Sequence, residues 1–531
     1  MPQSFALVPR PHAVEHGRGA FSLTAGLAID GREDWAAIVR RLLAPGTGLD
    51  LPAGPEGALR LHEDATLPAE GYRLDVTNAG IDISASDHRG VNWATQTLRQ
   101  LLPAAIYRPA PSSAVLQVPA VTITDAPRFG WRGVMLDVGR HFMPLADLYS
   151  FIDLLAMHKY NVFHLHLSED QGWRMESTSY PRLHQVASTR HQTRRPGQTE
   201  GDGTPHGGYY TQDQLRSLVA YAAQRGIEVV PELDFPGHVR AVLAAHPELS
   251  NNPEIEHTAA DTFGIFDEVL NLSDEAMEFV FAVFEELLDI FPSRYIHAGG
   301  DEAPRTEWLA SPAAAERAQQ RGLPDASHLQ NWFTGQLRDW LAERGRVLVG
   351  WDEINDEGHL EGAVTMAWRD AKYGIEAARA GGEVIAVPTS HLYFDYYQSN
   401  DPAEPYSIGG HLPIEKVYDF DPHEGVPQEA RDKILGTQAN LWTEYIPTMR
   451  RAQYHLFPRA CAHAEVAWSD PEGRDWNEFE PRVAGHLQRL DALGVNYRPL
   501  TGPHPWQRGG TGMFQRPAAH LPADDDDAAQ S

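Results

Sequence analysis

The chain has 531 residues, of which 42% are hydrophobic and 22% are charged, the balance of a folded protein long enough for two or three domains. Its 73 acidic residues outnumber its 44 basic ones and give a formal net charge of -29, which disfavours nucleic acid and anionic membranes as partners. The single cysteine, Cys461, excludes an intrachain disulfide and a paired-cysteine metal site.

Targeting signals are absent from the sequence as it stands. No apolar run approaches the roughly 20 residues that a transmembrane helix needs. The first residues lack the basic and apolar regions of a secretory signal. We therefore expect a cytoplasmic protein, unless a further segment precedes this start. The sequence carries no signal for oligomeric state.

Residues 1–126 alternate apolar runs with turns and predict a small α+β domain. GYRLDVTNAGIDISAS, at 71–86, predicts two strands around a turn at 78–80. VNWATQTLRQLL, at 91–102, predicts a helix that ends at Pro103. The proline and glycines of TDAPRFGWRG, at 124–133, predict the end of this domain.

Residues 127–475 repeat a β-run, a turn and an amphipathic helix. Pro144 starts one helix, and Thr211 and Gln214 form a capping box at the start of another. The repeat predicts a (β/α)8 barrel, with the small α+β domain in front of it. The eight β-runs start at Trp131, Asn161, Ile227, Arg294, Val347, Ala363, Glu383 and Ile434, and the seventh, EVIAVPTSHLYFD, extends to Asp395.

Two further segments lie outside this pattern. Residues 476–531 predict a C-terminal helix and then a tail whose acidic end, ADDDDAAQS, is expected to be disordered. Residues 188–208 predict a long polar loop after the second strand, with a solvated basic stretch, RHQTRR, at 190–195.

Charged and aromatic residues gather at the carboxyl ends of the eight β-runs. In a (β/α)8 barrel these ends form one face, where chemistry takes place. In chain order they are Asp137 and Arg140; Glu169 and Asp170; Glu232, Asp234 and His238; Asp301 and Glu302; Trp351, Asp352 and Glu353; Trp368 and Arg369; Tyr393 and Asp395; Trp442 and Glu444.

Acids and tryptophans in one pocket favour a sugar as the ligand. Carboxylates accept hydrogen bonds from hydroxyl groups, and indole faces cover the apolar face of a pyranose. The adjacent acids Asp301 and Glu302 suit glycosidic cleavage, because a neighbouring charge and burial allow one carboxyl to keep its proton while the other is ionised. The alternative for this pair is a helix-capping role.

The chain resembles the family 20 glycoside hydrolases, which are β-N-acetylhexosaminidases. The resemblance covers roughly residues 5–495 and includes EGYRLDV and TLRQLLP of a non-catalytic first domain. The motifs in the barrel are GRHF (139–142), HLHLSEDQGWR (164–174), PELDFPGH (231–238), HAGGDE (297–302), GWDE (350–353), LYFD (392–395) and NLWTE (440–444).

The resemblance implies a retaining, substrate-assisted mechanism in which the 2-acetamido oxygen of the substrate attacks the anomeric carbon and forms an oxazolinium intermediate. It implies that Glu302 is the general acid and base, that Asp301 binds the acetamido N–H, and that Tyr393 binds the acetamido oxygen. Trp351, Trp368 and Trp442 would surround the acetamido methyl group. Arg140, Asp395 and Glu444 would bind ring hydroxyls, and His238 would connect Glu302 to an acid of the second strand, where Glu169 occupies the position that usually pairs with the histidine and Asp170 follows it.

The implied substrate is a terminal β-linked N-acetylglucosaminide or N-acetylgalactosaminide, such as an imported chitobiose-like disaccharide, and no metal or cofactor is implied. Release of a disaccharide is an alternative within the family. One departure concerns Glu169, because the family often has aspartate where this chain has Glu169.

Several alternatives stay open at this point. Arg140 could form a salt bridge with Asp137 or Asp170, His238 could cap a helix, and the role of Tyr393 could belong to Tyr396 or Tyr397. His164 and His166 are expected to be packed core residues. Two other functions compete: a metal-dependent hydrolase that uses His164, His166, His238 and Asp301, and a sugar-binding protein without catalysis.

Overall fold

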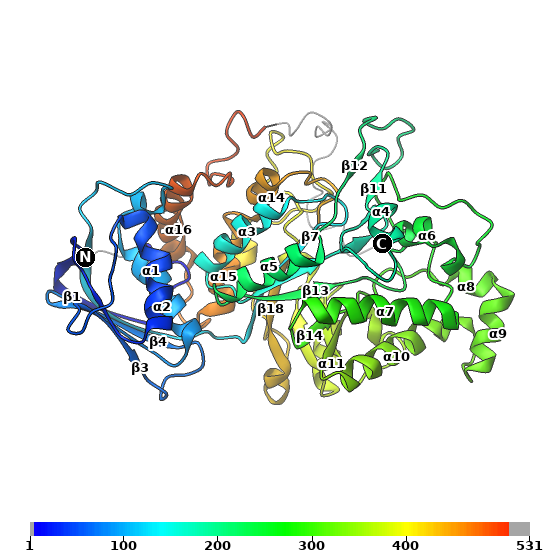
Figure 1. Cartoon of the computed structure of the whole chain (residues 1–531), viewed down its shortest axis with the longest axis horizontal. Coiled ribbons are helices and arrows are strands. Elements are labelled where there is room, and N and C mark those ends of the chain that lie inside the picture. The colour runs from blue at the N-terminus through cyan, green and yellow to red at the C-terminus, as the bar shows by residue number, and fades with distance from the viewer. Residues whose placement is uncertain (1–4, 509–531) are drawn as a thin grey trace.

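The N-terminal part of the chain forms a mixed sheet beside a closed barrel, as Figure 1 shows for residues 5–508, the part that the computed structural model describes. The sheet has six strands in the order β1-β6-β4-β5-β3-β2. The predicted pair of strands around the turn at 78–80 is confirmed as β4 and β5. The six strands are β1 (Ala13–Ser22), β2 (Ile29–Asp30), β3 (Leu59–Glu63), β4 (Tyr72–Thr77), β5 (Gly80–Ala85) and β6 (Gln117–Asp125).

Two helices, α1 (Glu33–Thr47) and α2 (His88–Leu101), lie on the side of this sheet that faces the barrel (Figure 1). Eleven residues of α2 are buried, which is typical of a helix covered on all sides. Its Asn92 donates a hydrogen bond to the carbonyl of Arg225 in the barrel at 3.1 Å. The helix therefore joins the sheet to the barrel.

The barrel is closed and all of its strand pairs are parallel, which confirms the predicted fold. The strand order is β13-β14-β15-β16-β17-β18-β7-β8, and β18 pairs with β7 from Gly436 opposite Trp131 to Leu441 opposite Leu136. The strands are β7 (Trp131–Asp137), β8 (Val162–His166), β13 (Glu228–Glu232), β14 (Tyr295–His297), β15 (Val347–Trp351), β16 (Val364–Ala367), β17 (Glu383–Ala386) and β18 (Ile434–Leu441). Two small hairpins, β9 (Ser168–Glu169) with β10 (Gly172–Trp173) and β11 (Thr189–Arg190) with β12 (His206–Gly207), lie in the loops after β8.

Helices cover the outside of the barrel. The helix expected after Pro144 is α3, and the capping box between Thr211 and Gln214 is formed at the start of α5. The helices are α3 (Leu145–Met157), α4 (Arg182–Gln185), α5 (Gln212–Ala223), α6 (Arg240–Ala245), α7 (Asp274–Ile290), α8 (Thr306–Ala310), α9 (Pro312–Gln320), α10 (Leu329–Glu343), α11 (Ala371–Arg379), α12 (Thr389–Leu392), α13 (Ile414–Asp419), α14 (Met449–Leu456), α15 (Arg459–Trp468) and α16 (Trp476–Leu493). Short 3-10 turns are η1 (Ala104–Tyr107), η2 (Pro247–Leu249), η3 (Ala326–His328), η4 (Asp352–Asn355) and η5 (Gln428–Lys433).

The seventh β-run is shorter than the sequence predicts. Strand β17 ends at Ala386, and the chain then passes through α12 before it reaches Tyr393. Pro388 has no N–H to donate to a neighbouring strand, so the run from Glu383 to Asp395 cannot continue as one strand. Tyr393 nevertheless pairs with Asn440 of β18 as an isolated bridge, which returns it to the barrel wall.

Buried ion pairs connect the N-terminal domain to the barrel. Arg132 of β7 reaches Glu70 at 2.5 Å, and Lys159 reaches Asp125 at 2.7 Å. The last helix, α16, adds Arg489, which donates hydrogen bonds to the carbonyls of Ala6 and Gln100. No helix in residues 5–508 is both long enough and apolar enough to span a bilayer. The acidic end of the predicted tail lies outside those residues.

Candidate active site

Asp301 and Glu302 follow strand β14 after a tight turn made by two glycines. Gly299 and Gly300 have positive φ angles of 68° and 100°. A Cβ atom on Gly299 would lie 1.7 Å from Oδ1 of Asp234, and the N–H of Gly300 donates to that same oxygen at 3.0 Å. The turn therefore requires glycine and packs directly on Asp234. It brings the two acids to His238.

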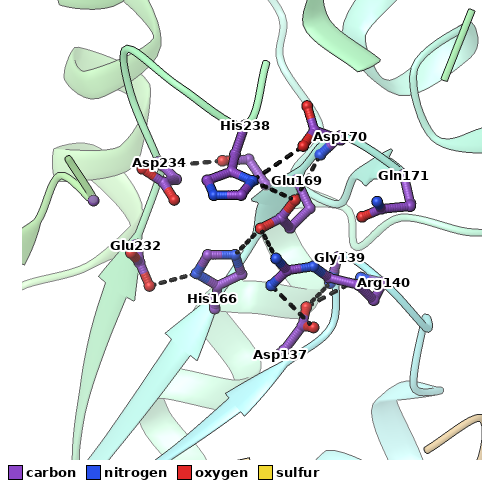
Figure 2. Close-up of polar contacts among 12 residues, drawn as sticks. Asp137, Gly139, Arg140, His166, Glu169, Asp170, Gln171, Glu232, Asp234 and His238 are labelled. Carbon is purple, nitrogen blue, oxygen red and sulfur yellow. Dashed lines mark hydrogen bonds and ion pairs between the residues drawn. The ribbon is translucent and has the colours of Figure 1, made fainter. Parts of the chain in front are cut away.

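Figure 2 shows His238 beside Glu169 and Asp170, the acids of the second barrel strand, and its other ring nitrogen lies near the acids of the fourth. Its Nδ1 atom is 3.0 Å from Asp170 and 3.2 Å from Glu169. Its Nε2 atom is 3.5 Å from Glu302 and 3.8 Å from Asp301. Burial alone would lower the pKa of His238, but the charge of Glu169 and the contacts with Asp170 and Glu302 outweigh it and hold the pKa well above its usual value.

Glu169 contacts two of the predicted site residues at once. Its Oε1 atom is 2.7 Å from Nη2 of Arg140, and its Oε2 atom is 3.2 Å from His238. The contact with histidine is thus made by the longer glutamate side chain. Burial favours the protonated form of Glu169, yet the charges of Arg140 and His238 hold its pKa far below the usual value.

Arg140 is buried against both charge and an aromatic ring. Its guanidinium lies between Glu169 and Asp137 in Figure 2, with Nη1 3.5 Å from Asp137. The guanidinium carbon is 4.8 Å from the centre of the Trp442 ring. The predicted alternative of a salt bridge between Arg140 and Asp137 is therefore formed in part. In this position the guanidinium also lies over the ring of Trp442.

The backbone around Arg140 is fixed by two other buried arginines. Arg174 donates to the carbonyls of Val138 and Gly139 at 2.9 and 2.6 Å, and Arg190 donates to the carbonyl of Arg140 at 2.6 Å. Arg190 belongs to the basic stretch that we expected to be solvated, and that expectation is wrong for it, because only 1% of the residue is exposed. A buried guanidinium needs several acceptors, and the carbonyls of Val138, Gly139 and Arg140 supply some of them.

Asp137 connects the first barrel strand to the last. Its Oδ1 atom accepts the N–H groups of Gly139 and Arg140 at 2.8 and 3.0 Å. Its Oδ2 atom accepts the backbone N–H and the hydroxyl of Thr443, both at 3.1 Å. The turn that carries Arg140 is thereby joined to the segment that carries Trp442 and Glu444.

Four aromatic rings meet in one cluster, called the aromatic wall below. They follow the last four barrel strands in chain order, β15 to β18. Trp351, Tyr393 and Trp442 are buried together, and Trp368 packs against them from a partly exposed position. The rings of Trp351 and Trp442 are 5.7 Å apart between centroids, and those of Trp368 and Tyr393 are 6.0 Å apart with 22° between planes. The three predicted tryptophans and the predicted tyrosine are thus brought together.

Buried polar atoms without partners border this aromatic wall. Oδ1 of Asp301, Oδ1 of Asp395, Oε2 of Glu444 and Nε of Arg140 have no hydrogen bond within the described part of the chain. Burial, the first cause in each case, raises the pKa values of Asp301, Asp395 and Glu444. Buried groups are normally satisfied, so this concentration indicates a polar ligand.

Glu232 lies at the end of the third barrel strand, and the sequence alone assigns it no role. Its side chain accepts the indole N–H of Trp351 at 2.9 Å and lies 2.5 Å from His166. His164 and His297 each lie 3.0 Å from it. A signal for this cluster is present in the sequence: polar residues occupy positions of adjacent barrel strands whose side chains point into the barrel, where apolar residues are usual.

The same cluster bears on the metal alternative. His164, Glu232 and His297 have the spacing of metal ligands, and so do His238, Asp301 and Glu302. The first group is fully buried against Trp351, and the indole N–H of Trp351 already donates a hydrogen bond to the Glu232 carboxylate. His164 and His166 are buried core residues as predicted. These contacts favour structural roles for the histidines over metal ligation.

Glu353 is a second carboxyl that the sequence placed at a strand end without a role. It accepts the indole N–H of Trp368 at 2.9 Å. Burial, followed by the charges of Asp301 and Asp352, raises its pKa to about 9. Glu353 also lines an open cavity of about 730 Å³, and Glu302, Arg305 and Ile265 form other parts of its wall. The cavity gives Glu302 access to solvent.

Comparisons with known proteins agree with this geometry. The model of the glycosyl hydrolase family 20 catalytic domain matches residues 129–471, and that of the family's domain 2 matches residues 4–126. The chain belongs to glycosyl hydrolase family 20. It is a glycoside hydrolase of the β-N-acetylhexosaminidase type.

Two relatives and one solved structure illustrate the family. A β-hexosaminidase of Porphyromonas gingivalis is 40% identical over 88% of this chain, and the chain spans 59% of that protein's length. A β-hexosaminidase of Akkermansia muciniphila is 37% identical, over 80% of this chain and 85% of its own. The Vibrio harveyi family 20 exo-β-N-acetylglucosaminidase, solved in complex with N-acetylglucosamine, has a TM-score of 0.84 and 32% identity, over 94% of this chain and 80% of its own.

Proposed function

We propose that this hydrolase releases single N-acetylhexosamine units from the non-reducing ends of β-linked saccharides and retains the configuration at the anomeric carbon. The observation that carries the proposal is that three buried carboxyl oxygens near the aromatic cluster, on Asp301, Asp395 and Glu444, have no hydrogen-bond partner in the described part of the chain. An N-acetylated sugar would supply hydroxyl and amide donors to those oxygens and a methyl group to the aromatic rings. The N-acetylglucosamine bound to the V. harveyi neighbour supports this ligand class.

In the proposed first step, the acetamido oxygen of the substrate attacks the anomeric carbon while the glycosidic C–O bond breaks. Glu302 gives its proton to the leaving oxygen, so that an alcohol departs and a cyclic oxazolinium ion stays bound. Asp301 accepts the acetamido N–H and stabilises the positive charge that develops there. Tyr393 donates a hydrogen bond to the acetamido oxygen and aligns it for attack. The burial of Asp301 supports its assignment to the charge that develops inside the pocket.

In the proposed second step, water attacks the anomeric carbon from the side that the alcohol left. Glu302 takes a proton from that water, and the bond between the anomeric carbon and the acetamido oxygen breaks. Two inversions at one carbon give the β-anomer as the product. The partial exposure of the Glu302 side chain, 30%, supports this role, because Glu302 must meet the alcohol and then the water.

The remaining residues bind and position the substrate. Arg140, Asp395 and Glu444 would hold ring hydroxyls, and their unpartnered polar atoms support this assignment. Trp351, Trp368 and Trp442 would surround the acetamido methyl and exclude water from the intermediate. His238 acts as a positioning residue through its contacts with Asp170 and Glu302. The cavity beside Glu302 offers room for the leaving sugar.

A hydrolysis panel tests the proposal. Aryl β-glycosides of N-acetylglucosamine and N-acetylgalactosamine are compared with the matching glycosides that carry a 2-hydroxyl, and NMR follows the first anomer released. We expect cleavage only with the acetamido group and the β-anomer as first product. Glu302→Gln should lower turnover of a poor leaving group by about 100-fold or more, because protonation of that group is lost. Cleavage of plain glucosides at a similar rate, or an α-anomer as first product, would refute the mechanism.

A further inference from the structure

A second cleft, of about 540 Å³, lies where the N-terminal domain meets the barrel. Its lining residues come from α1, α2 and η1 of the N-terminal domain and from α3 of the barrel, with contributions from the turn after α5, from α14 and from the end of α16. None of the residues assigned above to catalysis or sugar binding lines it. It is therefore separate from the glycosidase site.

Four arginines line this interdomain cleft: Arg41, Arg99, Arg108 and Arg225. Asp153 is the single acidic residue among the described lining residues. Such a concentration of positive charge is unexpected in a chain with 73 acidic and 44 basic residues.

The positive charges in the cleft are poorly neutralised. Asp153 is already paired with Arg225. Arg41 and Arg99 instead donate to neutral amide oxygens, those of Asn92 at 3.2 Å and of Gln96 at 2.9 Å. Within the part of the chain that the structure describes, neither of these two arginines has a carboxylate partner.

Three buried polar atoms on the lining residues have no hydrogen-bond partner within residues 5–508. They are Nε of Arg41, Nε of Arg99 and the hydroxyl oxygen of Tyr107, a residue that is only 3% exposed. The Arg99 guanidinium lies over the Tyr107 ring at 4.5 Å. Burial and then the charge of Arg225 lower the pKa of Arg41 to about 10, which reflects the same lack of compensating negative charge. Unsatisfied buried donors are rare and costly, so a missing acceptor is the simplest account of them.

The shape and lining of the cleft narrow the class of ligand. Guanidinium groups match the oxygen pairs of phosphate, sulfate and carboxylate groups through two parallel hydrogen bonds. Apolar side chains of Leu42, Ile106, Met157 and Leu493 line the rest of the cleft. The volume suits a small molecule.

We propose that the interdomain cleft binds a small organic oxyanion, with Arg41 and Arg99 holding the anionic group and the apolar side chains contacting the organic body. The site joins the N-terminal domain to the barrel, so an occupant would contact both. The proposal does not depend on the glycosidase mechanism, and its test needs no turnover.

Calorimetric titration of the full chain tests the proposal. Inorganic phosphate, glucose 6-phosphate and neutral glucose are titrated at constant ionic strength maintained with sodium chloride. We expect the sugar phosphate to bind more tightly than inorganic phosphate and glucose not to bind. Arg41→Gln and Arg99→Gln should each weaken sugar-phosphate binding by about tenfold or more, since each removes a charged hydrogen-bond donor. Arg18→Gln, an exposed position on β1, is the matched control and should leave the dissociation constant unchanged.

Thermal unfolding without ligand separates a binding role from a structural one. Arg41→Gln removes a charge that burial and then the charge of Arg225 disfavour, so its Tm should equal or exceed that of the wild type. Wild-type dissociation constants in both cleft variants, or no binding of either phosphate by the wild type, would overturn the proposal. Equal affinities for inorganic phosphate and the sugar phosphate would overturn the role of the apolar wall and assign the cleft to the free ion.

Discussion

The indole N–H of Trp368 donates a hydrogen bond to Oε2 of Glu353, with 2.9 Å between nitrogen and oxygen. The same indole stacks on Tyr393, the proposed ligand of the acetamido oxygen. Glu353 thus orients one ring of the aromatic wall. Its carboxyl is protonated near neutral pH, because its pKa is raised to about 9.

The first prediction concerns stability as a function of pH. Glu353 keeps its proton in the folded chain and releases it in the unfolded chain above its ordinary pKa of 4.5. The unfolded state therefore binds fewer protons between pH 4.5 and 9, and the free energy of unfolding falls as pH rises through this window. Glu353→Gln keeps the size and cannot ionise. We expect the Tm of Glu353→Gln minus the Tm of the wild type to increase as the pH is raised from 5 to 9.

Differential scanning calorimetry across this pH range measures the effect. Glu361→Gln, at an exposed position nearby, is the control and should follow the wild-type curve. Parallel curves for Glu353→Gln and wild type would show that Glu353 is ionised in the folded chain.

The second prediction separates Tyr393 from its neighbour. Tyr393→Phe keeps the ring that stacks on Trp368 but removes the hydroxyl proposed to align the acetamido oxygen. We expect kcat to fall by about tenfold to 100-fold, with little change in Tm. Tyr396→Phe is the matched control and should retain near wild-type kcat. The reverse pattern would move the role to Tyr396.

The third prediction concerns His238, whose pKa is raised by Glu169, Asp170 and Glu302 in opposition to burial. A histidine with a raised folded-state pKa adds stability that is fully present below pH 6.5 and is lost as the pH rises through the folded-state value. The Tm difference between wild type and His238→Gln should therefore be largest below pH 6.5 and shrink in alkaline buffer. A difference that is constant with pH would mean that His238 is neutral throughout.

The fourth prediction tests the connection between the domains. Glu70→Gln would leave Arg132 buried without its charge partner, which typically costs about 3–5 kcal/mol. The double variant Glu70→Gln with Arg132→Met should recover part of that loss, because no uncompensated charge remains. Urea unfolding measures both changes. Additive effects of the two substitutions would contradict the assigned pairing.

The barrel was predictable because its signal is repeated eight times in the sequence. The site was predictable to the extent that its residues follow strand ends, as Asp301 and Glu302 do. The shortened seventh strand was not recognised, although Pro388 in its middle marks the interruption. The run reads as one apolar segment, and Tyr393 returns to the wall only through pairing with the distant Asn440.

Other features depend on contacts that a linear pattern does not contain. Arg190 has the composition of a solvated loop, yet it is buried because the carbonyl of Arg140, 50 residues earlier, accepts its hydrogen bond. Glu232 is visible as a strand end, but its role depends on three histidines of the two neighbouring strands and on a tryptophan of β15, one strand farther along the barrel. Arg41 and Arg99 of the interdomain cleft are likewise separated in the sequence, on α1 and α2, and only the packing of the barrel against these helices closes the cleft around them.

The hydrogen bonds from Thr443 to Asp137 join positions that are 306 residues apart. Arg140 follows β7 and Glu444 follows β18, the two strands that close the barrel, and both residues belong to the proposed binding site for the sugar ring. During synthesis on the ribosome, the emerging polypeptide cannot assemble this site until its final barrel strand has left the exit tunnel. A nascent chain released before that moment would contain Asp301 and Glu302 but would lack part of the proposed binding site for the sugar ring.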